Sequence, residues 1–416
     1  MPDYNSFVYD LGALYDPKVI SSKCYAHFRM SFSCWNGANF GFDWLRNGDS
    51  EECVAVDIPY SDIVGANYKK GTNELETNGN IWNCDFRKDE KAYKRLSYTY
   101  FPPAVLPIIP IKDDYYAVPV LSLYPFNAHG IRVTASLVLH IYIKETVEEM
   151  YLDYDKKLFD IKCDSPLPVA KSNQRYTVSL DIKCNEGFDR DQFINVISVD
   201  KKGRKNLSGM LRVWRNSFIY QKKLSIGVYF VDFKGCPPMT SKIIDDHMKM
   251  IKEKLYFLWH ALIRPEVNRL KWSENDIEPL GKFSYNGDSN VLYDHKIKNV
   301  FLKKIEKLKK EPYDCIILYF NKPFVSKKVS NGYWGNPAFT NGKCVLLSSS
   351  AIKEIESTTT IHEILHSRGL MHTFDNNEKF TFKSKATDNL LDYSDIRVNW
   401  FHWQWQKATN GLPIDK

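Results

Sequence analysis

The residues with the clearest chemical potential are three histidines and a glutamate in HEILHSRGLMH, residues 362–372. His362 and His366 are four residues apart, so on a helix they share one face, with their β-carbons about 5–6 Å apart. That spacing lets two imidazole nitrogens reach one zinc ion. Glu363 points away from a ligand position but can reach water at the metal, where a general base belongs.

The residues after the second histidine supply a chain reversal and a third ligand. Gly369 can adopt the left-handed conformation that ends a helix. The reversal would bring His372 back toward the first two histidines, and three protein nitrogens would leave a fourth position open, as in a catalytic zinc site. The Ser-Thr-Thr run at 357–359 offers candidates for the helix N-cap.

The number of fixed positions decides how specific this pattern is. A bare HExxH occurs on many helices by accident, whereas H-E-x-x-H-x-x-G-x-x-H fixes five positions. The alternative is a helix with incidental histidines and a glycine cap. The five-position match favours a metal site.

The full pattern is the zinc signature of the metzincin metalloproteases, and a downstream segment resembles that family as well. Metzincins place a Met-turn beneath the zinc, and the matching stretch here is TDNLLDYSD, residues 387–395. Leu391 stands where the family has methionine. Because this exchange conserves volume, the resemblance implies that Leu391 keeps the hydrophobic floor and that Zn²⁺ still binds. An enzyme of reduced or lost activity is the alternative.

The resemblance also assigns roles to three other segments. Tyr393 matches a tyrosine that in some metzincins is a switchable zinc ligand and stabilises the oxyanion; the alternative is an aromatic core residue. The strand CVLLSS (344–349) occupies the place where the family binds substrate as an added β-strand. The closing WFHWQWQKATN (400–410) matches a C-terminal helix, with its tryptophans used for packing.

The elements around the motif predict a multidomain chain. Residues 1–145 are β-rich, with strand-like runs such as 133–143, and 146–222 contain further short strands that suggest a small immunoglobulin-like sandwich. From residue 223 the pattern changes to that of an α/β or α+β domain. Its expected elements are strands at 224–233, 315–320 and 344–349, and helices at 241–263, 296–310 and the motif. The predicted class is thus a sandwich-like β-rich region followed by a metzincin-like zincin domain at 223–416.

Composition excludes several other functions. Hydrophobic residues make up 44% and charged residues 26%, as in a folded soluble protein. The net charge is +7, and the basic runs KKGRK and KKIEKLKK are not interleaved with aromatic residues. Nucleic acid is therefore not an expected partner. The most apolar stretch, 104–111, contains two prolines and is too short to span a membrane.

Other groups that could do chemistry form weaker patterns. None of the nine cysteines forms a C-x-x-C pair, and the remaining histidines form no second ligand cluster. Ser348–Ser350 lie in no nucleophile motif. Asp375, Glu378 and Asp388 could contribute to a calcium site, but their spacing fits no EF-hand loop. A solvated loop is the preferred interpretation of these three.

These observations predict a zinc-dependent endopeptidase with Glu363 as general base and a protein or peptide as substrate. A looser resemblance, over GANFGFDWLRNGD (37–49) and the C-terminal segments, is to metzincin-like proteins of Bacteroidota, some associated with contractile (type VI-like) secretion. It implies that the first half is a delivery or adaptor region, with secretion-apparatus components as partners. Because the N-terminus resembles no signal peptide, we expect a cytoplasmic protein in the producing cell, exported by such a system. The alternatives are a non-catalytic adaptor with a degenerate zincin fold, and a zinc amidase acting on cell-wall peptides.

Overall fold

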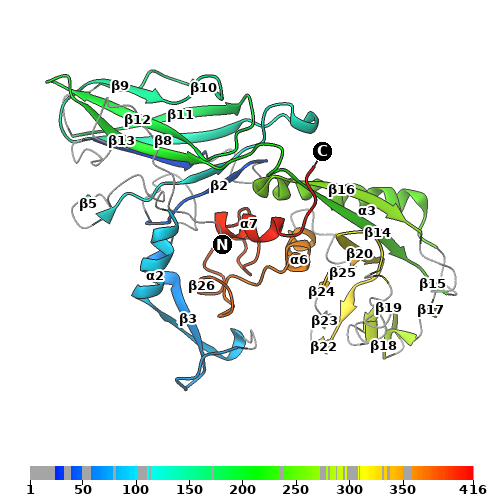
Figure 1. Cartoon of the computed structure of the whole chain (residues 1–416). Coiled ribbons are helices and arrows are strands. Elements are labelled where there is room, and N and C mark those ends of the chain that lie inside the picture. Colours follow the sequence, from blue (N-terminus) through cyan, green and yellow to red (C-terminus); the bar gives the residue numbers. More distant parts are fainter. Residues whose placement is uncertain are drawn as a thin grey trace. The chain divides into compact units, whose positions relative to one another are not determined.

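The computed structural model of the chain, drawn in Figure 1, divides into two compact units. One contains Met1–Tyr220 and His372–His402, and the other contains Gln221–Met371 and Trp403–Lys416. The structure describes residues 24–31, 39–48, 58–77, 81–100, 110–111, 114–169, 173–234, 238–271, 278–279, 282–286, 288–293, 296–297, 308, 310–329, 332–334, 338–349 and 358–415.

Two sheets form the larger part of the first unit. The four-stranded antiparallel sheet has the order β1 (Cys24–Met30), β8 (Ala135–Ile143), β11 (Gln174–Cys184) and β10 (Phe159–Cys163). The five-stranded sheet has the order β2 (Gly41–Asp43), β7 (Val120–Ser122), β13 (Lys205–Val213), β12 (Gln192–Asp200) and β9 (Val147–Asp153). In β8 every second residue is buried, which is the period expected of a strand with one face on a core.

The two sheets approach each other closely where β1 meets β13. The hydroxyl of Tyr116 donates to the Ala26 carbonyl of β1 at 2.8 Å and accepts from the Met210 amide of β13 at 3.0 Å. A β-carbon at Gly209 would lie 2.5 Å from the Ala26 carbonyl oxygen, so only glycine fits there. The predicted boundary at 145/146 falls between β8 and β9, strands of these two sheets. The division into three domains stays a prediction.

A smaller sheet in the same unit joins an N-terminal hairpin to a late segment of the chain. Its order is β26 (Thr381–Phe382), β3 (Val64–Lys69) and β4 (Cys84–Lys88). The ring of Phe382 packs against Tyr60 at 5.1 Å and Phe401 at 4.9 Å between centroids. The other described elements of this unit are α1 (Tyr60–Ile63), α2 (Glu90–Ser97), the 3-10 turns η2 (Ile81–Asn83), η3 (Tyr98–Tyr100) and η4 (Ala128–Gly130), and the pair β5 (Pro110–Ile111) and β6 (Asp114–Tyr115).

The second unit is built on a mixed five-stranded sheet. Its order is β16 (Ile263–Leu270), β14 (Lys222–Val231), β20 (Cys315–Phe320), β25 (Cys344–Ser348) and β24 (Ala338–Asn341). The first four strands are parallel and β24 is antiparallel. The strands predicted at 224–233, 315–320 and 344–349 are β14, β20 and β25. Smaller strands are β15 (Phe233–Lys234) with β17 (Glu278–Pro279), β18 (Ser284–Tyr285), β19 (Asp288–Tyr293) and β21 (Phe324–Val325), and β22 (Lys327–Val329) with β23 (Gly332–Trp334).

The helices of the second unit differ in part from the prediction. The helix expected over 241–263 ends at Glu253 as α3 (Ser241–Glu253) and gives way to the 3-10 helix η5 (Leu255–Ala261). Leu262 is left-handed (φ 55°), and the chain then enters β16, a strand that was not predicted because its side chains are mostly half-buried and polar. The helix predicted at 296–310 falls mostly outside the described residues. The motif forms α6 (Thr359–Ser367), and the C-terminal segment forms α7 (His402–Thr409).

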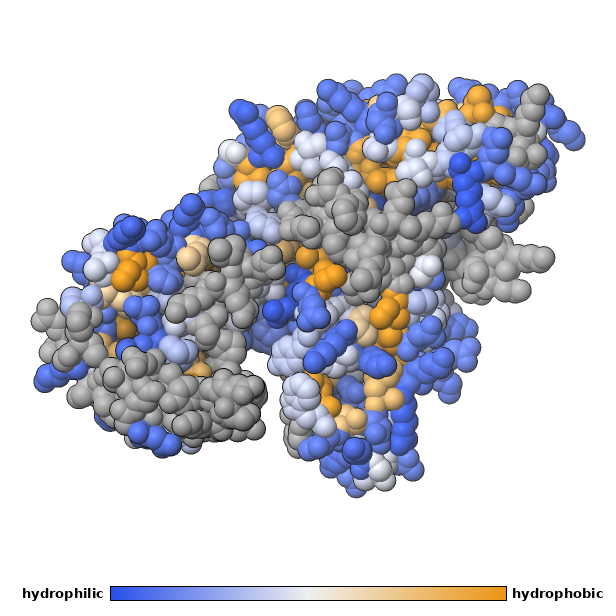
Figure 2. Space-filling view, turned by 180° about the vertical axis from the view of Figure 1, so that it is seen from behind, coloured by the Kyte–Doolittle hydropathy of each residue, from blue (hydrophilic) through white to orange (hydrophobic). Residues whose placement is uncertain are grey.

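Across the described residues the protein is mostly β-sheet with some helices, in several sheets, which agrees with a multidomain mixed fold. Its metzincin-like character stays a prediction. None of the described helices is long and apolar enough to cross a membrane. On the face shown in Figure 2, hydrophilic residues predominate, with hydrophobic residues visible between them in several places.

Replacing Gly209 with alanine is expected to lower the free energy of unfolding by about 1–3 kcal/mol, because the added methyl group overpacks the β1–β13 contact. Chemical denaturation of the purified chain measures this. Lys201→Ala, in the exposed turn between β12 and β13, is the control and should stay within about 0.5 kcal/mol of wild type. An unchanged denaturation midpoint for the Gly209 variant would contradict the close approach of the strands.

Candidate metal centre

The C-terminal end of α6 forms a Schellman motif at the predicted chain reversal. Gly369 has φ +79°, the left-handed conformation that the sequence predicts. The Gly369 amide donates to the His366 carbonyl at 2.9 Å, and the Leu370 amide donates to the Leu365 carbonyl at 3.2 Å. These two bonds satisfy carbonyls that the end of a helix would otherwise leave unpaired. They also turn the chain toward His372.

The reversal orients the second histidine of the motif. Nδ1 of His366 lies 2.8 Å from the Leu370 carbonyl oxygen. A carbonyl accepts only from a protonated nitrogen, so this contact places the proton on Nδ1 and leaves Nε2 unprotonated, with a lone pair that suits metal binding. The Nε2 atoms of His366 and His362 are 3.0 Å apart, and their rings are nearly perpendicular at 87°.

The three histidines of the motif converge. One ring nitrogen from each of His362, His366 and His372 lies within 4.8 Å of the other two, and this is the single such group found among the described residues. Nitrogens about 2.1 Å from a tetrahedral zinc lie roughly 3.4 Å apart. The pair at 3.0 Å is slightly closer than this spacing, and the third nitrogen lies within 4.8 Å of the other two. The donor set therefore fits a metal ion, and imidazole nitrogens suit zinc, copper, iron or nickel.

Aromatic rings hold the third histidine. The His372 ring stacks on Phe374 at 4.7 Å between centroids with an interplanar angle of 10°. The ring of Tyr393 lies 4.8 Å from His372 and 5.0 Å from Phe374. Tyr393 is 39% exposed, so the alternative of an aromatic core residue does not describe it.

The segment matched to the Met-turn is a tight, buried turn. The Asp392 amide donates to the Asn389 carbonyl at 3.0 Å, and the Leu391 amide donates to Oδ1 of Asn389 at 2.9 Å. Leu391 is fully buried, and its carbonyl accepts from the Thr373 amide at 3.1 Å. The turn is thus bonded to the residue that follows His372.

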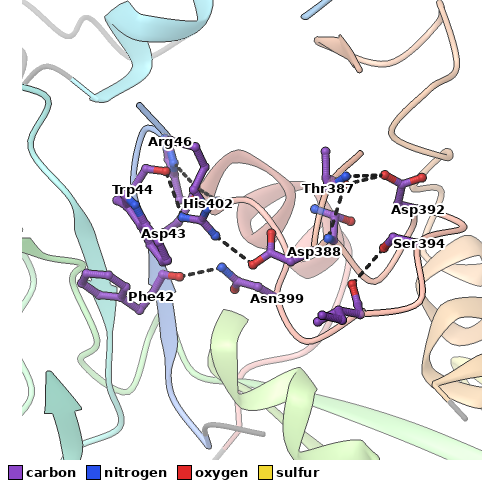
Figure 3. Close-up of polar contacts among 12 residues, drawn as sticks. Phe42, Asp43, Trp44, Arg46, Thr387, Asp388, Asp392, Ser394, Asn399 and His402 are labelled. Carbon is purple, nitrogen blue, oxygen red and sulfur yellow. Dashed lines mark hydrogen bonds and ion pairs between the residues drawn. The ribbon is translucent and has the colours of Figure 1, made fainter. Parts of the chain in front are cut away.

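Buried polar side chains attach this turn to the N-terminal part of the same unit, as Figure 3 shows. Arg46 and Asp388 form an ion pair at 2.8 Å with both side chains almost fully buried. Burial raises the pKa of Asp388, and the nearby Arg46 opposes that shift. The Asn399 side chain donates to the Phe42 carbonyl at 2.7 Å.

Glu363 lies one residue from the first histidine and contacts the neighbouring strand. The Thr340 hydroxyl of β24 donates to its carboxylate and also lies 3.1 Å from its backbone carbonyl oxygen. Burial raises the pKa of Glu363, and the electrostatic interaction with His366 and the hydrogen bond from Thr340 lower it by less. A carboxylate whose pKa is raised is a stronger base than an exposed one.

Several expectations require correction. The strand at 344–349, expected at the substrate-binding edge, is β25 and lies inside the sheet; the edge beside it is β24. Asp388 does not lie in a solvated loop, because it is 2% exposed and paired with Arg46. The tryptophans at 400 and 405 are fully buried, as expected for packing. Of the N-cap candidates, position 357 lies outside the described residues, and Thr358 makes no side-chain capping bond.

Sequence reasoning missed Thr340, Phe374 and Arg46. Thr340 and Arg46 are distant from the motif in sequence, and no pattern assigns either of them a role at the centre. Phe374 follows His372 by two residues, and its aromatic type was the one available signal. The structure brings all three to the segments that carry the motif residues.

Comparison with protein-family models and with curated proteins finds no match. Among solved structures, the chain is similar to metalloproteinase-II from Bacteroides fragilis, with a TM-score of 0.26 and 11% identity over 74% of this chain and 90% of that one. A 2,6-sialyltransferase from Photobacterium gives a TM-score of 0.11 and 10% identity over 49% of this chain and 34% of that one. TM-scores this low do not establish a shared fold or function.

Each of the variants His362→Ala, His366→Ala and His372→Ala is expected to lose bound metal, because each removes one of the three converging nitrogens. The loss of affinity should exceed the roughly 10–100-fold typical of groups that only support ligands. Metal analysis of the purified chain after dialysis measures it. His140→Ala, on β8 and outside the cluster, is the control. Full metal retention by all three variants would exclude this centre.

Proposed function

We propose that the chain is a zinc-dependent endopeptidase. The observation that carries the proposal is the convergence of three imidazole nitrogens within 4.8 Å, with Glu363 next to the first of these histidines on α6. His362, His366 and His372 are the proposed ligands, and three protein ligands leave room for reactants at the metal. When bound, zinc supplies Lewis acidity, which polarises a peptide carbonyl and acidifies water.

Glu363 is the proposed general base and then the general acid. Its carboxylate takes a proton from the attacking water as the water oxygen bonds to the peptide carbonyl carbon. When the carbon–nitrogen bond breaks, the carboxyl returns that proton to the leaving amine. The raised pKa of Glu363 supports both steps. The hydrogen bond from Thr340 fixes the orientation of the carboxyl.

The proposed substrate is an extended peptide added as a strand along β24. This strand ends the five-stranded sheet, and its Thr340 contacts Glu363, so a peptide on this edge would pass the carboxylate. Main-chain hydrogen bonds would supply affinity without a fixed sequence. Tyr393, exposed beside His372, is proposed to donate a hydrogen bond to the oxyanion.

The cellular setting stays a prediction that rests on resemblance alone. It comprises cytoplasmic residence, export through contractile secretion machinery and contact with its components. A non-catalytic adaptor would differ from the proposed enzyme in the absence of hydrolysis. A cell-wall amidase would differ in its preference for short peptides bearing D-residues.

Glu363→Gln is expected to reduce peptide hydrolysis by at least about 10²–10⁴-fold, because the amide cannot accept the proton of water. Metal content should be unchanged, since Glu363 is not among the three converging ligands. Turnover of a mixed peptide library, with metal content measured on the same samples, tests this. Glu311→Gln, at an exposed site in the same unit, is the matched control. Undiminished hydrolysis by the Glu363 variant would contradict the proposed role of Glu363 as general base.

Leu391→Met is expected to keep the free energy of unfolding within about 1.5 kcal/mol of wild type and to leave hydrolysis nearly unchanged, because the exchange conserves volume at a fully buried position. Leu391→Ala should cost about 2–5 kcal/mol by opening a cavity under the turn. Denaturation curves and peptide turnover of these two variants, each compared with wild type, test both expectations. A large gain in turnover with methionine would show instead that leucine limits the native enzyme.

A further inference from the structure

The segment that follows His372 is bonded to the N-terminal hairpin of β3 and β4. Asn376 presents its side-chain amide to that hairpin as a strand would. Its Oδ1 accepts from the Asn67 amide at 2.9 Å, and its Nδ2 donates to the carbonyls of Asn67 and Glu76, both at 2.7 Å. The Asn67 side chain donates to the Phe374 carbonyl at 2.6 Å. These four bonds between Asn67, Glu76, Phe374 and Asn376 are called the asparagine clasp below.

The clasp is buried at Asn67 and reaches the proposed third ligand through one residue. Asn67 is 6% exposed and Glu76 8%, and the bond from Asn67 to Phe374 is buried, whereas the three bonds of Asn376 are partly buried. The groups that join Asn67 to Phe374 are therefore shielded from bulk water. Each such group left unpaired costs about 1–3 kcal/mol. Phe374, whose carbonyl the clasp holds, is the residue whose ring stacks on His372. The clasp therefore fixes the ring against which His372 rests.

Backbone pairing continues the same attachment. Thr381 and Phe382 of β26 pair with Gly65 and Val64 of β3, immediately beyond the clasp. The Phe382 amide also donates to the Thr373 carbonyl at 2.8 Å. Residues 373 to 382 are thus tied to the hairpin at both ends.

The turn that carries Leu391 and Tyr393 has its own attachment to N-terminal residues. It is formed by the Arg46–Asp388 ion pair and by the bond from Asn399 to the Phe42 carbonyl (Figure 3). Arg46 also packs over the ring of Trp44, 3.1 Å from its centroid. Residues in the described stretches 42–48 and 58–76 therefore contact both segments, 372–382 and 387–402, that follow α6.

We propose that Asn67 and Asn376 are positioning residues that hold the His372 segment in its metal-binding conformation. The inference rests on the proposed function of the three histidines as metal ligands. A loop fixed before binding does not lose its conformational entropy when the ion arrives, and this raises affinity. The N-terminal region is then a working part of the metal centre, in addition to the delivery or adaptor role that the sequence resemblance implies.

Two clasp variants of the full chain test this, with zinc alone as the probe. Asn67→Ala removes the bond to Phe374, and Asn376→Asp keeps the side-chain size and Oδ1 but removes both donations from Nδ2. The added negative charge of aspartate would by itself favour a cation, so weaker binding would report the lost bonds. Asn73→Ala, at the exposed tip of the same hairpin, is the control.

The zinc dissociation constant, measured by competition with a chromogenic chelator, is expected to rise about 10–100-fold in both clasp variants and to stay unchanged in the control. A merely structural role would lower the melting temperature equally with and without zinc and leave the dissociation constant unmoved. Near-UV circular dichroism checks that each variant is folded. If Asn67→Ala is not folded, the zinc dissociation constant of the size-conserving variant Asn376→Asp tests the inference.

The outcomes separate this inference from the proposed function. Wild-type zinc affinity in folded clasp variants would overturn the inference alone. A wild-type chain that binds zinc with the predicted variant effect but hydrolyses no peptide would overturn the endopeptidase and keep the inference. A wild-type chain that binds no zinc would overturn both.

Discussion

The left-handed conformation of Gly369 is the constraint on which the candidate centre depends. It ends α6, pairs the last carbonyls of that helix and directs the Leu370 carbonyl to Nδ1 of His366. The same turn carries the chain to His372 within three residues. A residue with a β-carbon would be strained at φ +79°. One backbone angle thus helps to orient one candidate ligand and to position another.

Hydrogen bonds and an ion pair between polar groups then fix the positions of the segments that follow α6. The Arg46–Asp388 pair, the bond from Asn399 to Phe42 and, within the asparagine clasp, the bond from Asn67 to Phe374 lie away from bulk water. Removing one partner of such a pair leaves the other uncompensated, which costs more than an exposed pair would. The segments after α6 are therefore held in one arrangement by contacts that are costly to break.

Local sequence patterns predicted individual helices and strands better than they predicted how the strands are ordered in the sheet. Continuous apolar runs predicted β14, β20 and β25, and the spacing of the motif predicted α6. The strand β16 was missed because its side chains are polar and half-buried, and η5 was taken for helix because both share an apolar stripe. The edge position of β24 could not be read from AFTN, since sheet order depends on pairing between distant strands.

The sequence alone determined the ligand spacing, because His362, His366, Gly369 and His372 interact within one helical turn and the reversal that follows. It also determined that Glu363 lies beside the first of them. Only the tertiary structure decided that Thr340 meets Glu363, that Phe374 and Tyr393 support His372, and that Asn67 reaches Asn376 across 309 residues. Helical geometry is fixed by neighbours in the chain, whereas these contacts arise when separate segments bury their polar groups together.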